Sequence, residues 1–73
     1  MTGFFRIDDI IDALCEDAES EGIIVYRSKL TEWLYLSIDE ILHFRVPNIG
    51  NYVFSNEDKR AILRIAREKE YKF

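Results

Sequence analysis

Apolar residues recur at helical spacing through the first part of the chain. They are Ile7, Ile10, Ile11, Leu14 and Ala18. Because positions three and four apart share one face of a helix, this pattern predicts an amphipathic helix over residues 7–21. Asp8 and Asp9 suit the positive N-terminal end of that helix, and Gly22 lies where a left-handed C-cap favours glycine. A helix is therefore the first element of the predicted fold.

Length and composition place the chain among small globular domains. It has 73 residues, of which 48% are hydrophobic and 33% charged, so we expect a single domain over residues 1–73. No apolar run approaches ~18 residues, and no membrane span is predicted. The N-terminal stretch turns acidic where a secretory signal would become apolar, so no signal is expected. Cys15 alone cannot form an internal disulfide, which favours a reducing, cytoplasmic location.

Two segments have the composition of short β-strands. Residues 23–26 are four β-branched or aromatic residues in a row, which predicts a strand. Pro47 ends the preceding helix and favours extended backbone just before it, and residues 48–51 have turn chemistry. Residues 45–46 and 52–54 therefore predict the arms of a small β-hairpin around that turn.

The stretch between these segments predicts either two short helices or one long helix. Ser28 can cap a helix that begins at Lys29, and Ser37 with Glu40 has the spacing of a capping box that opens another helix. The apolar pattern also continues without a gap, so a single helix over residues 29–44 is the alternative. The sequence leaves this choice open.

The last predicted helix covers residues 56–70. Ser55 and Asp58 have capping-box spacing at its start. Its inward-facing residues are Ile62, Ile65 and Ala66. A stripe of three arginines, Arg60, Arg64 and Arg67, lies roughly opposite that apolar face.

The predicted order of helix, strand, two helices, hairpin and helix resembles a winged helix-turn-helix domain. Residues 28–42, SKLTEWLYLSIDEIL, resemble a helix-turn-helix, and residues 50–63, GNYVFSNEDKRAIL, resemble the second wing strand and following helix of mercury-resistance-type regulators and phage excisionases. The resemblance implies a mainly α fold with a small β-hairpin. A ribbon-helix-helix fold is the second choice, with residues 4–7 as the ribbon; it gives residues 45–54 no role.

The leading functional hypothesis is a small DNA-binding transcriptional regulator of the winged helix-turn-helix type, because the resemblance implies double-stranded DNA as partner. Its candidate contacts are groups that can bind phosphate. They are Arg27, Ser28 and Lys29 at the start of the second helix, Arg45, Asn48 and Asn51 in the hairpin, and Arg60 and Arg64 on the last helix. Capping, turn formation and a solvated helix face are the plain structural explanations of the same residues. Since so short a chain makes few phosphate contacts, a homodimer through the last helix, with Tyr71 and Phe73, is expected.

The charge distribution favours a second hypothesis of another class. The formal net charge is −4, and residues 1–44 hold three basic against ten acidic residues. An acidic stripe on the first helix consists of Asp9, Asp12, Glu16 and Glu19. Such a stripe solubilises a helix, and it can also bind a basic protein. The alternative function is therefore an acidic adaptor or inhibitor of a nucleic-acid-handling protein.

No catalytic, metal or cofactor site is predicted. His43 is the single histidine, and nothing in the sequence places it near Cys15. A nucleophile needs a base within hydrogen-bond reach. The chain also lacks a glycine-rich phosphate loop, a zinc-ligand pattern and the spacing of a calcium loop. We therefore expect a protein that is not an enzyme.

Overall fold

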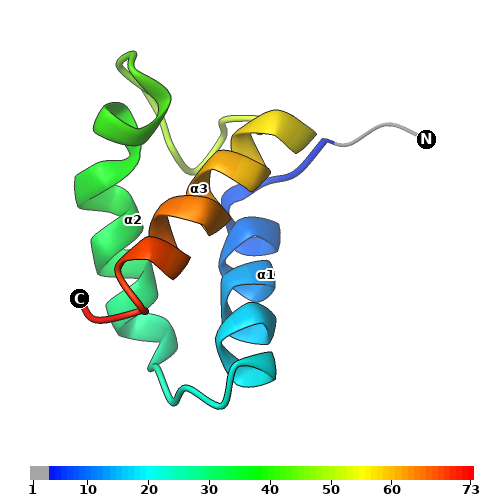
Figure 1. The fold of residues 1–73 in the computed structure, drawn as a ribbon. Coiled ribbons are helices and arrows are strands. Elements are labelled where there is room, and N and C mark those ends of the chain that lie inside the picture. Colours follow the sequence, from blue (N-terminus) through cyan, green and yellow to red (C-terminus); the bar gives the residue numbers. More distant parts are fainter. Residues whose placement is uncertain (1–3) are drawn as a thin grey trace.

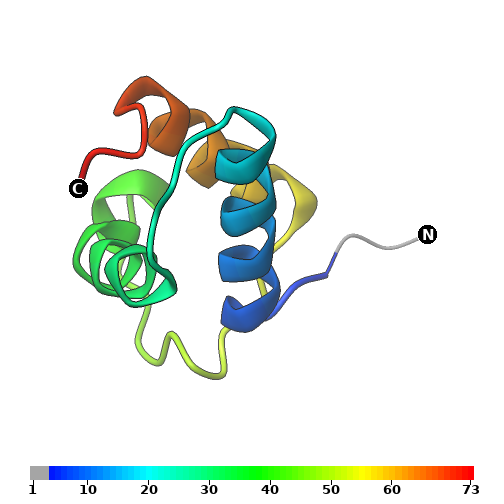
Figure 2. The same ribbon diagram turned by 90° about the horizontal axis from the view of Figure 1, so that it is seen from below.

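The computed structural model describes residues 4–73 and is built from three helices. They are α1 (Ile7–Ser20), α2 (Arg27–Leu42) and α3 (Asn56–Glu68). Helices α1 and α2 run side by side in opposite directions, and α3 crosses in front of both (Figure 1). The view from below shows that α3 covers one side of this pair, with the connection from α1 to α2 at the near end (Figure 2).

The hydrophobic core lies where the three helices meet. Its fully buried large side chains are Ile10, Leu14, Leu30, Leu34, Phe54 and Ile62. The five apolar positions that predicted the first helix are all buried, so that prediction is confirmed. Gly22 is left-handed, with φ 73°, and the backbone N–H of Ile23 donates to the oxygen of Ala18 at 2.9 Å. This is the Schellman arrangement that glycine favours at a helix end.

The strand predicted for residues 23–26 is wrong. This segment is a loop, in which Ile23 and Val25 pack against the core while Ile24 is 90% exposed. The alternation of inward and outward side chains is that of an extended chain. Strand propensity depends on packing against a paired neighbour, and no segment within residues 4–73 pairs with this one.

The two predicted middle helices are one helix, so the single-helix alternative is confirmed. α2 begins two residues before Lys29 and continues through Ser37 without a break. Leu34 and Ile38 are both buried on either side of the expected turn, and their packing carries the helix through it. The helix ends at Leu42, and its C-cap His43 is left-handed with φ 64°.

The predicted hairpin does not form. The amide of Val46 donates to the Asp39 carboxylate at 2.8 Å, whereas Phe54 pairs with Phe5 through N···O distances of 2.8 and 2.6 Å. The turn is present, because the amide of Asn51 donates to the oxygen of residue 48 at 3.1 Å. Phe54 is fully buried, and its anchoring in the core takes residues 52–54 away from the expected partner arm.

The fold prediction is therefore corrected. Residues 4–73 contain three helices and an isolated β-bridge but no strand or sheet, so the chain has neither the wing of a winged helix-turn-helix nor the ribbon of a ribbon-helix-helix. The start of α3 is as predicted: Asp58 N–H donates to Ser55 Oγ, and Ser55 N–H donates to the Asp58 carboxylate, both at 3.1 Å. The helix ends at Glu68, two residues before the predicted boundary.

Candidate functional site

The predicted DNA contacts do not come together on one surface. Arg27, Ser28 and Lys29 lie in the first turn of α2, whereas Arg45 and the 48–51 turn follow its opposite end. A helix of 16 residues is about 24 Å long. These two groups therefore lie at opposite ends of α2, and the fold has no separate recognition helix or wing to bring them together.

Arg27 is paired inside the chain with a residue of the rival site. Its Nη1 lies 2.6 Å from Asp12 Oδ1, and both side chains are more than half exposed. The hydrogen bond to Asp12 raises the pKa of Arg27 above its usual value. Arg27 is a predicted DNA contact, and Asp12 belongs to the acidic stripe predicted to bind a protein. Because the two charges neutralise each other, neither predicted surface has its full charge.

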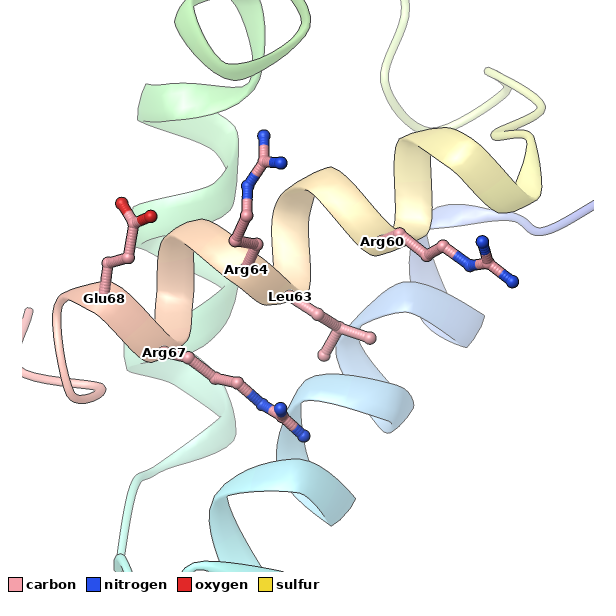
Figure 3. Close-up of a pocket in the computed structure, with 5 residues that line it drawn as sticks. All are labelled: Arg60, Leu63, Arg64, Arg67 and Glu68. Carbon is pink, nitrogen blue, oxygen red and sulfur yellow. The ribbon is translucent and has the colours of Figure 1, made fainter.

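The arginine stripe of α3 lies on an exposed face, as predicted. Its three arginines, with Leu63, line a shallow hollow of about 490 Å³ (Figure 3). Figure 3 shows Arg60 and Arg67 extending from α3 on the side of α1, with Leu63 between them, while Arg64 extends to the other side of α3. Arg60 and Arg64 form no ion pair with another residue of the described chain. Arg67, in contrast, is bound to α1.

Among residues 4–73, Asp17 accepts more side-chain hydrogen bonds than any other residue, and the sequence analysis missed it. Its carboxylate accepts from Arg67 Nε at 2.9 and 3.1 Å and from Arg67 Nη2 at 2.5 Å. It also accepts from the Tyr71 hydroxyl at 2.5 Å. We call these three residues the Asp17 clasp. The clasp ties the last turn of α3, and Tyr71 three residues beyond the helix, to α1.

The clasp shifts the ionisation of its members. The pKa of Asp17 lies below its usual value, chiefly because Arg67 donates to the carboxylate, and burial opposes this shift. Burial is the main cause that raises the pKa of Tyr71, and its hydrogen bond to Asp17 adds to the shift. At neutral pH the clasp therefore consists of an ionised carboxylate, a charged guanidinium and a neutral phenol.

The segment that brings Tyr71 to Asp17 has unusual backbone. Glu70 and Tyr71 both have positive φ, at 54° and 56°, and the amide of Tyr71 donates to the oxygen of Ala66 at 3.0 Å. This repeats the Schellman arrangement of α1, with a glutamate in the place of glycine. An L-residue in the left-handed region is disfavoured, so the clasp and the burial of Tyr71 compensate for local strain.

The acidic stripe of α1 is exposed along its whole length. Asp9 accepts from the backbone N–H of Arg6 at 3.0 Å and completes the start of the helix. Asp12 holds the ion pair described above. Glu16 and Glu19 form no ion pair with any residue among 4–73. These two carboxylates keep their charge directed to solvent.

The remaining candidates do not form a site. Cys15 is half-buried in α1, and His43 is exposed beyond the end of α2. Within residues 4–73 no cluster of histidine, cysteine, aspartate and glutamate has the arrangement of a metal site. The helices of the same region include none with the length and apolar character needed to cross a membrane.

Comparisons with known proteins returned no relative. No protein-family model, curated protein or solved structure matches this chain.

Proposed function

We propose that this protein is a small protein-binding module that presents the acidic face of α1 to a basic partner. The observation that carries this proposal is the exposed pair Glu16 and Glu19, whose charges no described residue neutralises. They lie one turn apart, so they can contact lysine or arginine side chains of one partner surface together. The net charge of −4 favours approach of a cationic protein over a polyanion.

The geometry of the cations supports the same choice. A DNA-binding surface needs several unpaired cations at phosphate spacing. Here Arg27 and Arg67 are each bound to an aspartate of α1, and Arg45 lies at the far end of α2 from Lys29. Among residues 4–73, the cations without an ion pair lie just before α1, at both ends of α2, and along α3.

The proposal is tested by matched charge reversals in an affinity-capture experiment. Glu16→Lys changes the charge of the α1 face, and Glu57→Lys makes the same change at an exposed position in the first turn of α3. We expect a basic protein to be captured by the native chain and by Glu57→Lys, but at least tenfold less by Glu16→Lys. Equal capture by all three chains contradicts the proposal. Circular dichroism melting confirms that each variant is folded.

Nucleic-acid binding through α3 is the second candidate. It has the support of Arg60 and Arg64, which are exposed, one turn apart along α3, and form no ion pair with any of residues 4–73. Arginine binds phosphate in a bidentate manner, so each of these two residues can contact a phosphate from its own side of α3. On this hypothesis, the double variant Arg60→Glu, Arg64→Glu abolishes binding to duplex DNA, whereas Glu16→Lys strengthens it.

A further inference from the structure

The connection between α1 and α2 presents an extended apolar segment at one end of the molecule (Figure 2). Ile23 and Val25 are half-buried against the core, whereas Ile24 is 90% exposed and Tyr26 is 71% exposed. Among residues 4–73, Ile24 is the most exposed large apolar side chain. Apolar side chains that alternate in this way and lie open to solvent indicate a surface on which another chain can pack.

The backbone of this segment has hydrogen-bonding groups without partners. At its start the Ile23 amide donates to α1, and at its end the Tyr26 oxygen accepts from two amides of α2. Between these points, the amides of Ile24, Val25 and Tyr26 and the oxygens of residues 23–25 form no backbone hydrogen bond within residues 4–73. Tyr26 has extended backbone, with φ −84° and ψ 139°. Free amides and carbonyls on extended backbone can pair with a strand of another molecule.

The helix ends that flank the segment carry charges of opposite sign. The last turn of α1 has no basic residue, and Glu19 and Glu21 lie at that end. The first turn of α2 has no acidic residue and carries Arg27 and Lys29. Both arrangements oppose the helix dipole, which favours cations at a C-terminus and anions at an N-terminus. Glu21 and Lys29 are exposed and form no ion pair with any of residues 4–73, so each can bind an opposite charge of another molecule.

We propose that a second copy of the chain covers this segment, and that the two copies form a homodimer by antiparallel pairing of residues 23–26 about a twofold axis at Val25. The Val25 amide of each copy donates to the Val25 oxygen of the other. Ile24 of each copy lies opposite Tyr26 of the other, and both side chains point to the exposed face. A β-branched residue opposite an aromatic residue is a pair that stabilises antiparallel strands.

Charge complementarity favours both the occupant and the register. Continued to the flanking helix ends, this register sets Glu21 of each copy opposite Lys29 of the other, and the twofold symmetry forms the pair twice. The end of α1 then lies beside the start of α2 of the second copy, where opposite charges and dipoles attract. An axis at Ile24 instead sets Glu21 opposite Arg27, which is already bound to Asp12. One chain thus supplies both members of each ion pair.

Sedimentation equilibrium of the native chain measures the dimer directly. So short a strand pair is marginal in water, so we expect association at about 100 μM chain and above. Glu21→Lys and Lys29→Glu each set like charges opposite one another twice, and we expect each to weaken the dimer by about tenfold or more. The two substitutions change the net charge in opposite directions, so overall charge does not account for a loss in both.

An equimolar mixture of the two variants tests the pairing itself. In a heterodimer of Glu21→Lys with Lys29→Glu, both ion pairs join opposite charges again. We therefore expect the mixture to associate about as strongly as the native chain, although neither variant does so alone. A mixture that associates no more than its components overturns the proposal, as does a native chain that remains monomeric up to about 1 mM. Circular dichroism melting verifies that each variant is folded.

A matched pair of substitutions tests the apolar contact. Ile24→Lys and Leu36→Lys each replace a highly exposed apolar residue, but Leu36 lies in α2, outside the segment. We expect only Ile24→Lys to abolish the dimer. Equal weakening by both variants contradicts pairing through residues 23–26.

Amide exchange tests the register. We expect the Val25 amide to exchange about threefold or more slowly at about 1 mM chain than at about 10 μM, because the dimer binds it. The Ile24 amide points to the opposite edge and should exchange at one rate. Equal rates for Val25 at both concentrations refute this register. The interface does not use Glu16 or Glu19, so its failure leaves the capture result for Glu16→Lys unaffected.

Discussion

The Asp17 clasp contributes much more stability than the other aspartate–arginine pair of the same helix. Replacement of Asp17 by alanine removes the acceptor of the Tyr71 hydroxyl, and Tyr71 is only 5% exposed. An unpaired buried hydroxyl costs about 1–3 kcal/mol. Asp17 is itself 10% exposed, whereas Arg67 is 61% exposed, so solvent screens their ion pair and we assign it at most about 1 kcal/mol.

The net effect follows from these terms and from helix propensity. Alanine is a better helix former than aspartate, which offsets the loss by about 0.5 kcal/mol. We therefore expect Asp17→Ala to lower the free energy of unfolding by about 1–3 kcal/mol. For a domain of this size, such a loss lowers the melting temperature by about 5–20 °C.

Asp12→Ala provides the matched control. Asp12 also binds an arginine, at 2.6 Å, but 61% of its side chain is exposed and no buried hydroxyl depends on it. We expect its replacement to change stability by less than about 1 kcal/mol. Urea denaturation followed by circular dichroism at pH 7 measures both variants. If the two costs agree within about 0.5 kcal/mol, the solvent shielding of the clasp does not have the importance assigned to it.

Three further predictions concern pH and helix ends. The pKa of Asp17 is lowered in the folded state. The stability that this carboxylate contributes is therefore present above the unfolded pKa of about 3.9 and is lost as pH falls through the folded pKa. In urea melts, the difference in stability between the native chain and Asp17→Asn should shrink below about pH 4. Glu70 is left-handed, so we expect Glu70→Gly to raise stability by about 0.5–1 kcal/mol, whereas Glu68→Gly, within α3, should lower it by about 1 kcal/mol. If thermal melts show that both variants shift the melting temperature in the same direction, the left-handed backbone of Glu70 does not reduce stability. Ser55 accepts from the Asp58 amide, so Ser55→Ala should cost about 1 kcal/mol in the same assay, and an unchanged melting temperature would exclude a role for this cap.

Local signals in the sequence predicted the helix ends well. The spacing of Ser55 and Asp58, and the glycine at position 22, each encode a hydrogen bond within a few residues, and each forms as expected. The buried face of α1 follows from periodicity alone, since every apolar position of that face meets the core.

Non-local pairing decided the parts of the prediction that were wrong. Residues 23–26 have strand composition, but strand formation depends on a neighbour that the fold does not supply. Phe54 pairs with Phe5 across 49 positions of sequence, and no pattern within residues 45–54 signals that choice. Ser37 has the spacing of a capping box, yet the burial of Leu34 and Ile38 keeps it inside α2.

The same limit applies to the candidate site. The sequence placed Arg67 in a stripe of three arginines, but its partner Asp17 lies 50 positions away. No residue near Asp17 in the sequence indicates that its carboxylate has a partner on another helix. Arg27 and Asp12 were assigned to rival surfaces, and the fold brings them together. Charge patterns along a helix show which face is polar, but they do not show which charges remain free after the helices pack.

A titration of labelled duplex DNA with the pure protein separates the two functional classes most directly. At ~50 mM salt the electrostatic part of DNA binding is strong, and it weakens steeply toward ~200 mM. The proposed protein-binding function predicts no binding at low salt up to about 100 μM protein, which is the weak end of the usual range of non-specific DNA binding. Micromolar, salt-sensitive binding that is lost in the Arg60→Glu, Arg64→Glu double variant would contradict it and identify the arginine stripe of α3 as the working surface.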